Sequence, residues 1–552
     1  MANELEIIKA LKLEIVKTKA TNRSPLYNTM LYWSQKPFTI TRAIIDMMTR
    51  SGDVIMDPFM GSGVTLIECL RKNKKRMGIG VDVNEMPIFL ATRALYDLSS
   101  AQREKLLNLM DRVNLYNRYY YTKCDFCDNE RAVITKVLYD REPKRVNEIQ
   151  YKCKCRKGIL KKKPDGDDVD NFDQSYPACK NINNIELLEN SRIAVKANEK
   201  IKDKFSERNF YVLDLIRGDI DTEADTHLYD IELYIYASII HKAKILDAKM
   251  SSQWPLWVPK KNCVERNVAE MFRESIAKFM KSRKFVEAEY DTDGAECLDC
   301  EEMMRAGQGV LIFDCGVQNV LGDKVPDDSV DLVITDPPYL SQVPYSEYMQ
   351  IYKAFLGKNI NFVDEIVITN AKQREIGYST YMLMMRGAFK NISRMMKNLA
   401  YMFMYFHDPS LQFWCDLVDI FADAKLEFVT TIHINKTAKT LKKILDPKKT
   451  MSGETLIVFR KNINMTGRQG REFSDGHMVR LREIAEKIIM DSPKQSVTTS
   501  MLYDNGVLEY LITEGIIEDF ATKYSDLADF FGEILRWNAN TGEWERRPNT
   551  PS

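Results

Sequence analysis

Two short segments carry the residue types that could do chemistry. Asp57-Pro-Phe-Met-Gly-Ser-Gly63 follows an apolar run and holds two glycines, which let a backbone turn tightly and approach a ligand. Thr335-Asp-Pro-Pro-Tyr339 ends a second apolar run and offers a carboxylate, two prolines and an aromatic ring. Each segment occurs once, in this order. The first is typical of a turn that cradles a nucleotide-like cofactor, and the second could receive a planar base with an exocyclic amine.

The second segment suits chemistry on such an amine. Its nitrogen lone pair is delocalised into the ring, so the nitrogen is a poor nucleophile until its hydrogens are held out of the ring plane. Asp336 can accept one N–H and the Pro337 carbonyl the other, while Pro337 and Pro338 fix the backbone. Tyr339 offers a face on which an extruded base can stack. These catalytic candidates would act by positioning, without a metal or a covalent intermediate.

Hydrophobic periodicity predicts the elements that position both segments. Residues 24–98 run helix, strand, glycine turn, helix, strand, helix, which is the first half of a doubly wound α/β sheet. The turn lies between an apolar strand and a predicted helix from Val64 to Arg71. Later strands are predicted at 309–313, 330–335, 400–406, 428–434 and 455–460. The fold class is therefore a Rossmann-like doubly wound sheet interrupted by one large insert.

A chain of 552 residues is too long for one core, because domains average about 150 residues. We predict four regions. Residues 1–112 form the first half of the catalytic domain, with the cofactor motifs, and residues 306–461 form its second half. Residues 113–305 form an α+β insert with a long helix from Glu265 to Glu289, and residues 462–552 form a small, mainly helical C-terminal region.

Amino-acid composition indicates the compartment and the kinds of partner to expect. Hydrophobic residues make up 45% of the chain and charged residues 29%, and no apolar run approaches the roughly 20 residues that span a bilayer. The N-terminus lacks the uninterrupted apolar stretch of a signal peptide. We therefore expect a cytoplasmic protein without a membrane partner, whose eleven cysteines are thiols or metal ligands rather than disulfides. Net charge is zero, so any nucleic-acid surface must be local.

Together the two segments resemble the amino-methylating DNA methyltransferases that use S-adenosylmethionine. Ser34-Gln-Lys-Pro-Phe-Thr39 is similar to the family's motif that closes over the methionine end of the cofactor. Gly78-Ile-Gly-Val-Asp82-Val-Asn84 looks like the second strand, whose terminal acid holds the ribose. Val343-Pro-Tyr345-Ser-Glu347, Phe406-His407-Asp408 and a set of cysteines resemble the adenine-specific methylases that contain a zinc ribbon. The resemblance covers most of residues 24–461.

The resemblance implies S-adenosylmethionine as the cofactor. Asp57 would take the methionine ammonium and Asp82 both ribose hydroxyls, while Asp314, at a later strand end, could read the adenine ring. The spacing of Asp82 also fits a dinucleotide fold, although the turn lacks the Gly-x-Gly-x-x-Gly pattern of a dehydrogenase. A tight glycine turn in an unrelated α/β protein is the alternative. The implied cofactor-binding set is Lys36, Asp57, Pro58, Phe59, Gly61, Ser62, Gly63, Asp82 and Asp314.

The insert contains a candidate metal site. Cys124-x-x-Cys127 and Cys153-x-Cys155 form two close pairs that could offer four thiolates to one structural zinc, with a small hairpin between them. Four buried thiols are the alternative. Residues 141–163 hold ten Lys or Arg against two Glu and could contact phosphates, or form an ordinary solvated face. Cys297-x-x-Cys300 is a weaker metal candidate, because no second close pair accompanies it.

The predicted function is site-specific methylation of double-stranded DNA, with methyl transferred from S-adenosylmethionine to a flipped base. Asp rather than Ser at the head of the second segment favours adenine N6 over cytosine N4 in the resembling families. A cytosine C5 methylase is set aside, because it would need a Pro-Cys pair, which the chain lacks. The resemblance also suggests a modification or defence system, with a restriction partner.

Two rival functions stay open. An RNA guanine-N2 methyltransferase uses similar motifs in the same order, but only about twenty residues precede the first motif here, which leaves no room for its usual N-terminal RNA-binding domain. A zinc-ribbon nucleic-acid-binding module on an inactive methylase fold is the non-enzymatic rival. Asp57, Asp82 and Asp336 are all present, which favours the enzyme.

Overall fold

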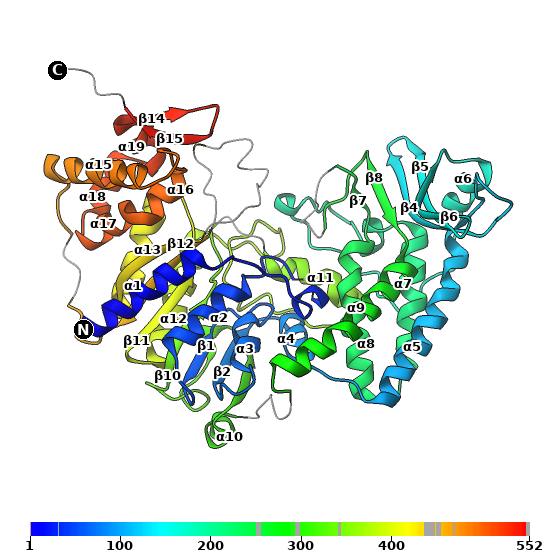
Figure 1. Ribbon diagram of the computed structural model, residues 1–552, viewed down its shortest axis with the longest axis horizontal. Coiled ribbons are helices and arrows are strands. Elements are labelled where there is room, and N and C mark those ends of the chain that lie inside the picture. Colours follow the sequence, from blue (N-terminus) through cyan, green and yellow to red (C-terminus); the bar gives the residue numbers. More distant parts are fainter. Residues whose placement is uncertain are drawn as a thin grey trace.

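The structure is a computed structural model that describes residues 2–30, 32–249, 256–292, 299–340, 344–434, 448, 454–466 and 470–547. Two lobes stand side by side in Figure 1. The left lobe contains the main sheet, α1 and the C-terminal helices, and the right lobe contains long helices capped by a small sheet. Within the described residues, no helix is long and apolar enough to cross a membrane.

The left lobe is built on a mixed sheet. Among the described residues it has seven strands, in the order β12-β13-β11-β10-β1-β2-β9. Their bounds are β1 Val54–Asp57, β2 Met77–Asp82, β9 Gly309–Asp314, β10 Val330–Thr335, β11 Met396–Tyr405, β12 Leu426–Ile434 and β13 Glu454–Lys461. The strands from β9 to β11 are parallel, and β13 runs antiparallel to both β11 and β12. The predicted α/β class and all five later strands are confirmed.

Strand order reverses between β1 and β10. From β1 the sheet extends through β2 to β9, and the chain then returns to place β10 on the other side of β1, with Ile55 opposite Leu332. In open α/β sheets, ligands bind outside the carboxyl ends of the strands where the order reverses. Asp57 ends β1 and Asp336 follows β10, so both predicted carboxylates lie at this point.

Helices cover both faces of the sheet. Because side chains alternate along a strand, Ile55 packs on one face and Met56 on the other. The face of Ile55 is covered by α1 and α2, and the face of Met56 by α10, α12, α13 and the C-terminal region. The helix bounds are α1 Ala2–Lys17, α2 Phe38–Met48, α10 Cys300–Ala306, α12 Tyr378–Met395 and α13 Leu411–Asp423.

A third core joins the two lobes. It contains residues of α3, α4 and α11 from the left lobe together with the insert helices α5, α7, α8 and α9. The bounds are α3 Val64–Cys69, α4 Glu85–Arg93, α5 Ser100–Asn114, α7 Glu207–Ile220, α8 Thr226–Ala243, α9 Val268–Glu289 and α11 Tyr345–Leu356. The helix predicted from Val64 to Arg71 is α3, which ends two residues earlier, at Cys69. Shared packing makes the lobes one continuous hydrophobic unit.

The small sheet of the right lobe has the order β6-β5-β4-β8-β7, with β3 paired to β4. Its bounds are β3 Tyr121–Thr122, β4 Ala132–Arg141, β5 Lys144–Cys153, β6 Arg156–Lys162, β7 Leu246–Asp247 and β8 Cys263–Arg266, with α6 Gly166–Asp173 beside it. The predicted hairpin is the β4–β5 pair. The prediction of helix from Glu265 was wrong at its start, because β8 pairs with β4 and Asn267 then caps α9 by accepting from the Glu270 N–H.

The C-terminal region packs against the main sheet. Its bounds are α15 Asp475–Met490, α16 Thr499–Leu502, a π-helical turn Tyr503–Val507, α17 Leu508–Thr513, α18 Ile517–Lys523, α19 Leu527–Ile534, β14 Leu535–Asn538 and β15 Glu543–Arg546. Short 3-10 helices lie at Tyr27–Thr29, Leu115–Tyr120, Ser191–Ile193, Ile201–Lys204 and Val317–Asn319. The four-region division stays a prediction, and α5, which it assigns to residues 1–112, packs with α8 and α9.

Candidate active site

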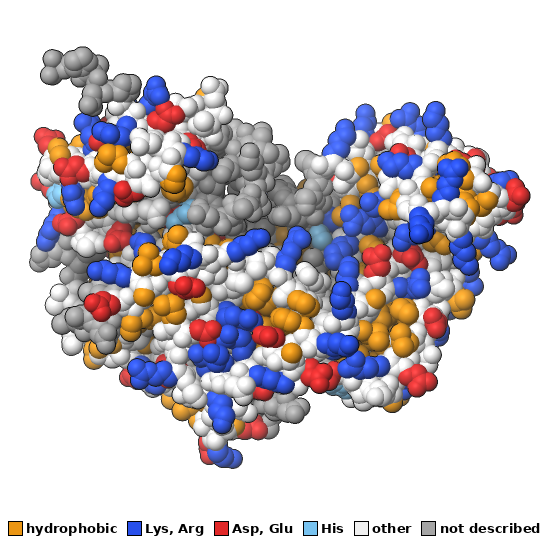
Figure 2. Space-filling model, viewed as in Figure 1, with side chains coloured by type: hydrophobic (Ala, Val, Ile, Leu, Met, Phe, Trp, Pro, Cys, Tyr) orange, Lys and Arg blue, Asp and Glu red, His pale blue; other side chains and the backbone are white. Residues whose placement is uncertain are grey.

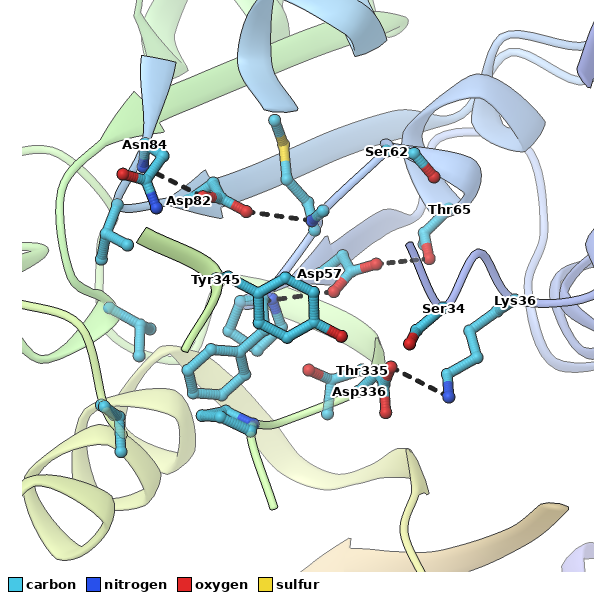
Figure 3. A pocket seen from close by; sticks show the side chains of 18 of the residues that line it. Ser34, Lys36, Asp57, Ser62, Thr65, Asp82, Asn84, Thr335, Asp336 and Tyr345 are labelled. Atoms are coloured by element: carbon cyan, nitrogen blue, oxygen red, sulfur yellow. Dashed lines mark hydrogen bonds and ion pairs between the residues drawn. The ribbon is translucent and has the colours of Figure 1, made fainter. Parts of the chain in front are cut away.

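A pocket opens at the carboxyl edge of the main sheet, where strand order reverses. It encloses about 1030 Å³, part of which is open to solvent. Its walls come from residues 32–36, the β1–α3 turn, the end of β2, the segment after β9 and the end of β10. Figure 3 shows Asp57 at the end of β1, Asp82 at the end of β2 and Asp336 just after β10 around this one pocket. Residues 57 and 336, which are 279 positions apart in sequence, thus meet in space.

The β1–α3 turn depends on its glycines for two different reasons. Both adopt left-handed backbone, with φ of 47° at Gly61 and 71° at Gly63. A Cβ at Gly61 would lie 3.0 Å from the Tyr32 ring at the pocket wall. A Cβ at Gly63 would lie 2.4 Å from the Cβ of Ala91 in α4. Gly61 therefore serves the pocket, whereas Gly63 lets α3 pack against α4.

Asp57 and Asp82 are held by donors from the turn. Asp57 accepts from the Phe59 N–H at 3.3 Å and from the Thr65 hydroxyl at 2.7 Å. Asp82 accepts from the Gly61 N–H at 3.1 Å and the Asn84 N–H at 3.0 Å. Each carboxylate keeps lone pairs for a ligand, because an ionised carboxylate has about four acceptor sites.

Burial is the dominant influence on both carboxyls. It raises the pKa of Asp57 to about 7, although the hydrogen bonds from Thr65 and Phe59 act in the opposite direction. Burial likewise raises the pKa of Asp82 to about 7 against two backbone N–H donors. The pocket therefore holds two carboxyls poised between charge states near neutral pH, and a cationic or hydroxyl-bearing ligand would favour the charged form.

Asp336 lies between a cation and a phenol. Lys36 Nζ is 2.9 Å from Asp336 Oδ2, and the Tyr339 hydroxyl donates to Asp336 Oδ1 at 2.7 Å. Burial raises the pKa of Asp336, and Lys36 and Tyr339 lower it without cancelling that effect. Burial alone would lower the pKa of Lys36, but Asp336, Tyr339 and Glu454 together outweigh it and hold that pKa well above its ordinary value. Lys36, predicted from a cofactor motif, thus contacts the predicted catalytic carboxylate.

The structure gathers most of the predicted site residues and leaves some outside. The pocket is lined by Lys36, Asp57, Pro58, Phe59, Gly61, Ser62, Asp82, Asp336 and Pro338. Gly63, Pro337 and Tyr339 adjoin lining residues, and the Tyr339 ring packs against Phe406 with centroids 4.8 Å apart. Asp314 pairs with Asp82 across β9 and β2 but is exposed and outside the lining. Val343 and Cys297 lie outside the described residues.

Some residues that line the pocket were not predicted from the sequence. Thr65 is one, and its position as the second residue of α3, beside the end of β1, was the available signal. Glu365 is another: it lines the pocket, and its Oε1 accepts from the Ser346 N–H at 2.9 Å at the start of α11. The Thr335 hydroxyl is buried with no hydrogen-bond partner among the described residues. An orphan hydroxyl and two recessed carboxyls give the pocket the polar lining that a nucleoside-containing cofactor needs.

The four predicted metal ligands meet in the right lobe. Cys124 and Cys127 lie between β3 and β4, and Cys153 and Cys155 lie at the β5–β6 turn. All four sulfurs lie within 4.8 Å of one another, with 3.6 Å from Cys124 to Cys155 and from Cys127 to Cys153. A tetrahedral zinc with bonds of about 2.3 Å places sulfurs about 3.8 Å apart. The residues present therefore fit such an ion.

Sequence comparison bears on the part of the chain that builds the cofactor side of the pocket. The profile of a DNA methylase family, the N6/N4 methyltransferases, matches residues 11–91. We call residues 11–91, which are similar to this family, the methylase segment. This methylase segment contains Lys36, Asp57, the glycine turn and Asp82, so the predicted resemblance to amino-methylating DNA methyltransferases is confirmed, with the match lying on the first of the two segments that carried it.

One relative matches a shorter stretch. The type II methyltransferase M.HpaI of Haemophilus parainfluenzae is 37% identical over 62 residues, which are 11% of this chain. The match spans about a fifth, 19%, of the length of that relative. A stretch of 62 residues is thus similar to a type II methyltransferase, while activity, substrate and partners of the whole chain are matters for proposal.

Two solved structures share local similarity. One is described as a DNA modification methylase from Thermus thermophilus, with 14% identity, a TM-score of 0.15, and coverage of 32% of this chain and 59% of that one. The other is described as a class I S-adenosylmethionine-dependent methyltransferase from Listeria monocytogenes, with 16% identity, a TM-score of 0.17, and coverage of 35% and 52%. TM-scores this low do not show a shared overall fold.

Proposed function

We propose that this chain is a DNA methyltransferase that transfers methyl from S-adenosylmethionine to the exocyclic amine of a flipped base. The observation that carries the proposal is the convergence of Asp57, Asp82 and Asp336 on one pocket where strand order reverses. The methylase segment supplies the first two carboxyls, and the later Asp-Pro-Pro-Tyr segment supplies the third. Two halves of the chain therefore share one site.

The residues of this chain bind and orient the reactants. Asp57 would take the methionine ammonium and Asp82 the ribose hydroxyls. S-adenosylmethionine supplies an activated methyl group, so the protein need not form a covalent intermediate. Asp336 would accept one N–H of the target amine and the Pro337 carbonyl the other, which turns the nitrogen lone pair out of the base plane. Tyr339 fixes the Asp336 carboxylate through its hydroxyl.

Adenine N6 is our preferred target atom. Its support is Asp336 at the head of the Asp-Pro-Pro-Tyr segment, since the resembling families tend to place Ser there for cytosine N4. The methylase segment is shared by both classes. Cytosine N4 is therefore the alternative.

The insert would recognise the DNA, with zinc as its structural metal. Its predicted basic run forms β5, β6 and the turn between them, and Figure 2 shows Lys and Arg gathered over this part of the right lobe. Eight of the ten cations are exposed, and we name them the ribbon cations: Lys144, Arg145, Lys152, Lys154, Arg156, Lys157, Lys161 and Lys163. Double-stranded DNA would be the main partner, in the cytoplasm, alongside a restriction or defence protein.

The test is transfer of labelled methyl to unmethylated genomic DNA and, separately, to total RNA, followed by nucleoside analysis. We expect N6-methyladenine in DNA. Label as N4-methylcytosine would move the target to the alternative base, and N2-methylguanine in RNA would overturn the DNA assignment. Cofactor binding without transfer to either polymer would favour the binding module on an inactive fold.

A matched pair of variants assigns the chemistry to the pocket. Asp336→Ala should abolish transfer and leave cofactor binding largely intact, because Asp336 faces the target amine rather than the ribose or ammonium. Asp323→Ala removes an exposed carboxylate from the loop before β10 and should leave transfer unchanged. Equal activity of the two variants would contradict the catalytic role assigned to Asp336.

A further inference from the structure

Lys36 is shared between two carboxylates. Its ammonium lies 2.9 Å from Asp336 Oδ2 and 3.1 Å from Glu454 Oε1, and its side chain is 13% exposed. The ring of Tyr405 lies 5.2 Å and that of Tyr339 5.9 Å from the same ammonium. Glu454 is the first residue of β13, on the far side of β11 from Asp336, and no sequence motif pointed to it.

The contacts leave Asp336 oriented but not saturated. Lys36 contacts Oδ2 and Tyr339 contacts Oδ1, so both oxygens have a fixed partner. A carboxylate has about four acceptor sites, so each oxygen can still receive one N–H. A protonated carboxyl in the same place would instead present an O–H toward one of its partners. The target amine therefore needs Asp336 in its ionised form.

We propose that Lys36 and Glu454 are opposed positioning residues for methyl transfer: Lys36 keeps Asp336 ionised and oriented, and Glu454 limits how strongly Lys36 holds it. This inference rests on the proposed function, because it gives the two residues their roles through Asp336. It assigns Lys36 a second role beside its predicted contact with the cofactor, and it brings Glu454 into the site.

Charge explains why the two residues act in opposite directions. Burial raises the pKa of Asp336, the Lys36 ammonium lowers it, and the Glu454 carboxylate raises it. An attractive cation favours the charged form of a carboxyl and a nearby anion disfavours it. The other titratable groups that interact with Asp336 are Tyr339, Tyr345, Tyr405 and Asp57. Only Lys36 among these groups is a cation, so among the described residues it supplies the attraction.

The first test is the pH dependence of kcat, measured with cofactor and DNA both saturating. Under those conditions kcat reports groups in the loaded enzyme, which removes the titration of Asp57 and Asp82 on cofactor binding. Lys36→Met should move the acid limb of the profile up by at least about one pH unit, and Glu454→Gln should move it down. Lys36→Arg should restore most of the wild-type profile, because it keeps the charge.

Opposite shifts are the distinguishing result. A residue that only stabilises the fold would lower kcat across the whole pH range and would not move the limb. Acid limbs that coincide in wild type, Lys36→Met and Glu454→Gln would overturn the proposal. Shifts of the same sign in both variants would also overturn it.

The second test needs no catalysis, so it separates failure of this inference from failure of the proposed function. Infrared difference spectra of the full chain at pH 7 report protonated carboxyl groups. The difference between the Lys36→Met and wild-type spectra should contain an extra protonated-carboxyl band, beyond the partly protonated Asp57 and Asp82 of both proteins, and Asp336→Asn should remove this extra band in the Lys36→Met background. Absence of that band would overturn the proposal even if DNA is methylated, and its presence would support the coupling even if the wild-type protein transfers no methyl.

Discussion

At the scale of single residues, folding places Asp57 and Asp82 where their own charge is disfavoured. Both are buried beside the glycine turn, and burial raises each pKa to about 7. A folded pKa above the unfolded value means that the fold binds protons more tightly, so these carboxyls contribute stability below an unfolded pKa near 4 and lose that contribution as pH rises toward 7. Buried carboxyls with raised pKa values are typical of a site that is completed by a bound ligand.

Affinity for S-adenosylmethionine should weaken as pH falls from 8 to 6. The two carboxyls become protonated in this window, and a neutral carboxyl attracts the methionine ammonium less strongly. We expect a loss of about tenfold for each carboxyl that must be ionised. Calorimetric titration across this range checks it. Asp57→Asn should bind more weakly and show a flatter dependence, whereas an affinity independent of pH in wild type would contradict the assignment.

Gly63→Ala should destabilise the protein more than Gly52→Ala. Both glycines have positive φ, 71° and 89°, so each alanine costs backbone strain of about 1 kcal/mol. At Gly63 the new Cβ would also meet Ala91 at 2.4 Å, whereas at Gly52 nothing lies within 4 Å. Overpacking adds about 1–3 kcal/mol. Denaturant unfolding of both variants measures the difference, and equal losses would show that α3 and α4 adjust to the extra methyl.

At the scale of elements, the cysteine cluster is what ties the β3–β4 turn to the β5–β6 turn. The Phe126 N–H donates to Cys124 Sγ at 3.4 Å and the Asn129 amide to Cys153 Sγ at 3.3 Å, and donors of this kind favour thiolates over thiols. Thiolates drawn together repel one another, so the geometry favours a bound cation. The β4–β5 hairpin itself packs Ile134, Val137 and Ile149 into the core shared with the insert helices, so a metal would fix the two turns rather than create that core.

The purified protein should contain one zinc per chain, and Cys127→Ser should lose most of it. Without the metal, β4–β6 should become sensitive to protease, because folding of the turn depends on the four ligands. Elemental analysis and limited proteolysis provide the two readouts. Cys179→Ser is the control, since Cys179 lies in the same lobe but outside the cluster. Zinc content unchanged by Cys127→Ser would contradict the site.

At the scale of the whole molecule, one of the three hydrophobic cores crosses from the left lobe into the right lobe. One hydrophobic core runs from the methylase segment, through Phe38 and Val64, into α8 and α9 of the insert. Under the proposed function, the right lobe would recognise DNA, and its direct packing on the left lobe would fix where DNA lies relative to the pocket. The chain has no net charge, but the ribbon cations are a local group of exposed positive charges. DNA affinity should therefore depend on these cations rather than on the net charge of the whole molecule.

Reversing three ribbon cations, Lys154, Arg156 and Lys157, to Glu should weaken DNA binding and flatten its salt dependence. The slope of log affinity against log salt falls by about 0.9 for each phosphate that the protein no longer neutralises. Fluorescence anisotropy at several salt concentrations measures the slope. Reversal of Lys72, Lys74 and Lys75 is the matched control, because this exposed loop enters β2 at the edge opposite the pocket. Equal effects of the two sets would show that the ribbon cations have no specific role.

Local sequence determined the elements and the chemistry of the main motifs. Asp57 with its glycine turn, the strands after residue 305 and the cysteine pairs could all be predicted, because periodicity, turn residues and ligand spacing act over a few neighbouring positions. The methylase segment carries enough of this local pattern to match the model of a DNA methylase family. The role of Gly63 could not be predicted, because Ala91 meets it only when α4 packs on α3.

Tertiary structure alone decided which groups share the pocket. Lys36, Asp336 and Glu454 are separated by hundreds of residues, and no local pattern relates a loop before α2 to the first residue of β13. The order of strands brings them together, because β11 lies beside β10 and β13 beside β11 only after the sheet has formed. Whether Asp336 carries charge depends on burial and on partners from those distant segments. The sequence therefore determined which groups could react, and the folded chain decided their ionisation and their neighbours.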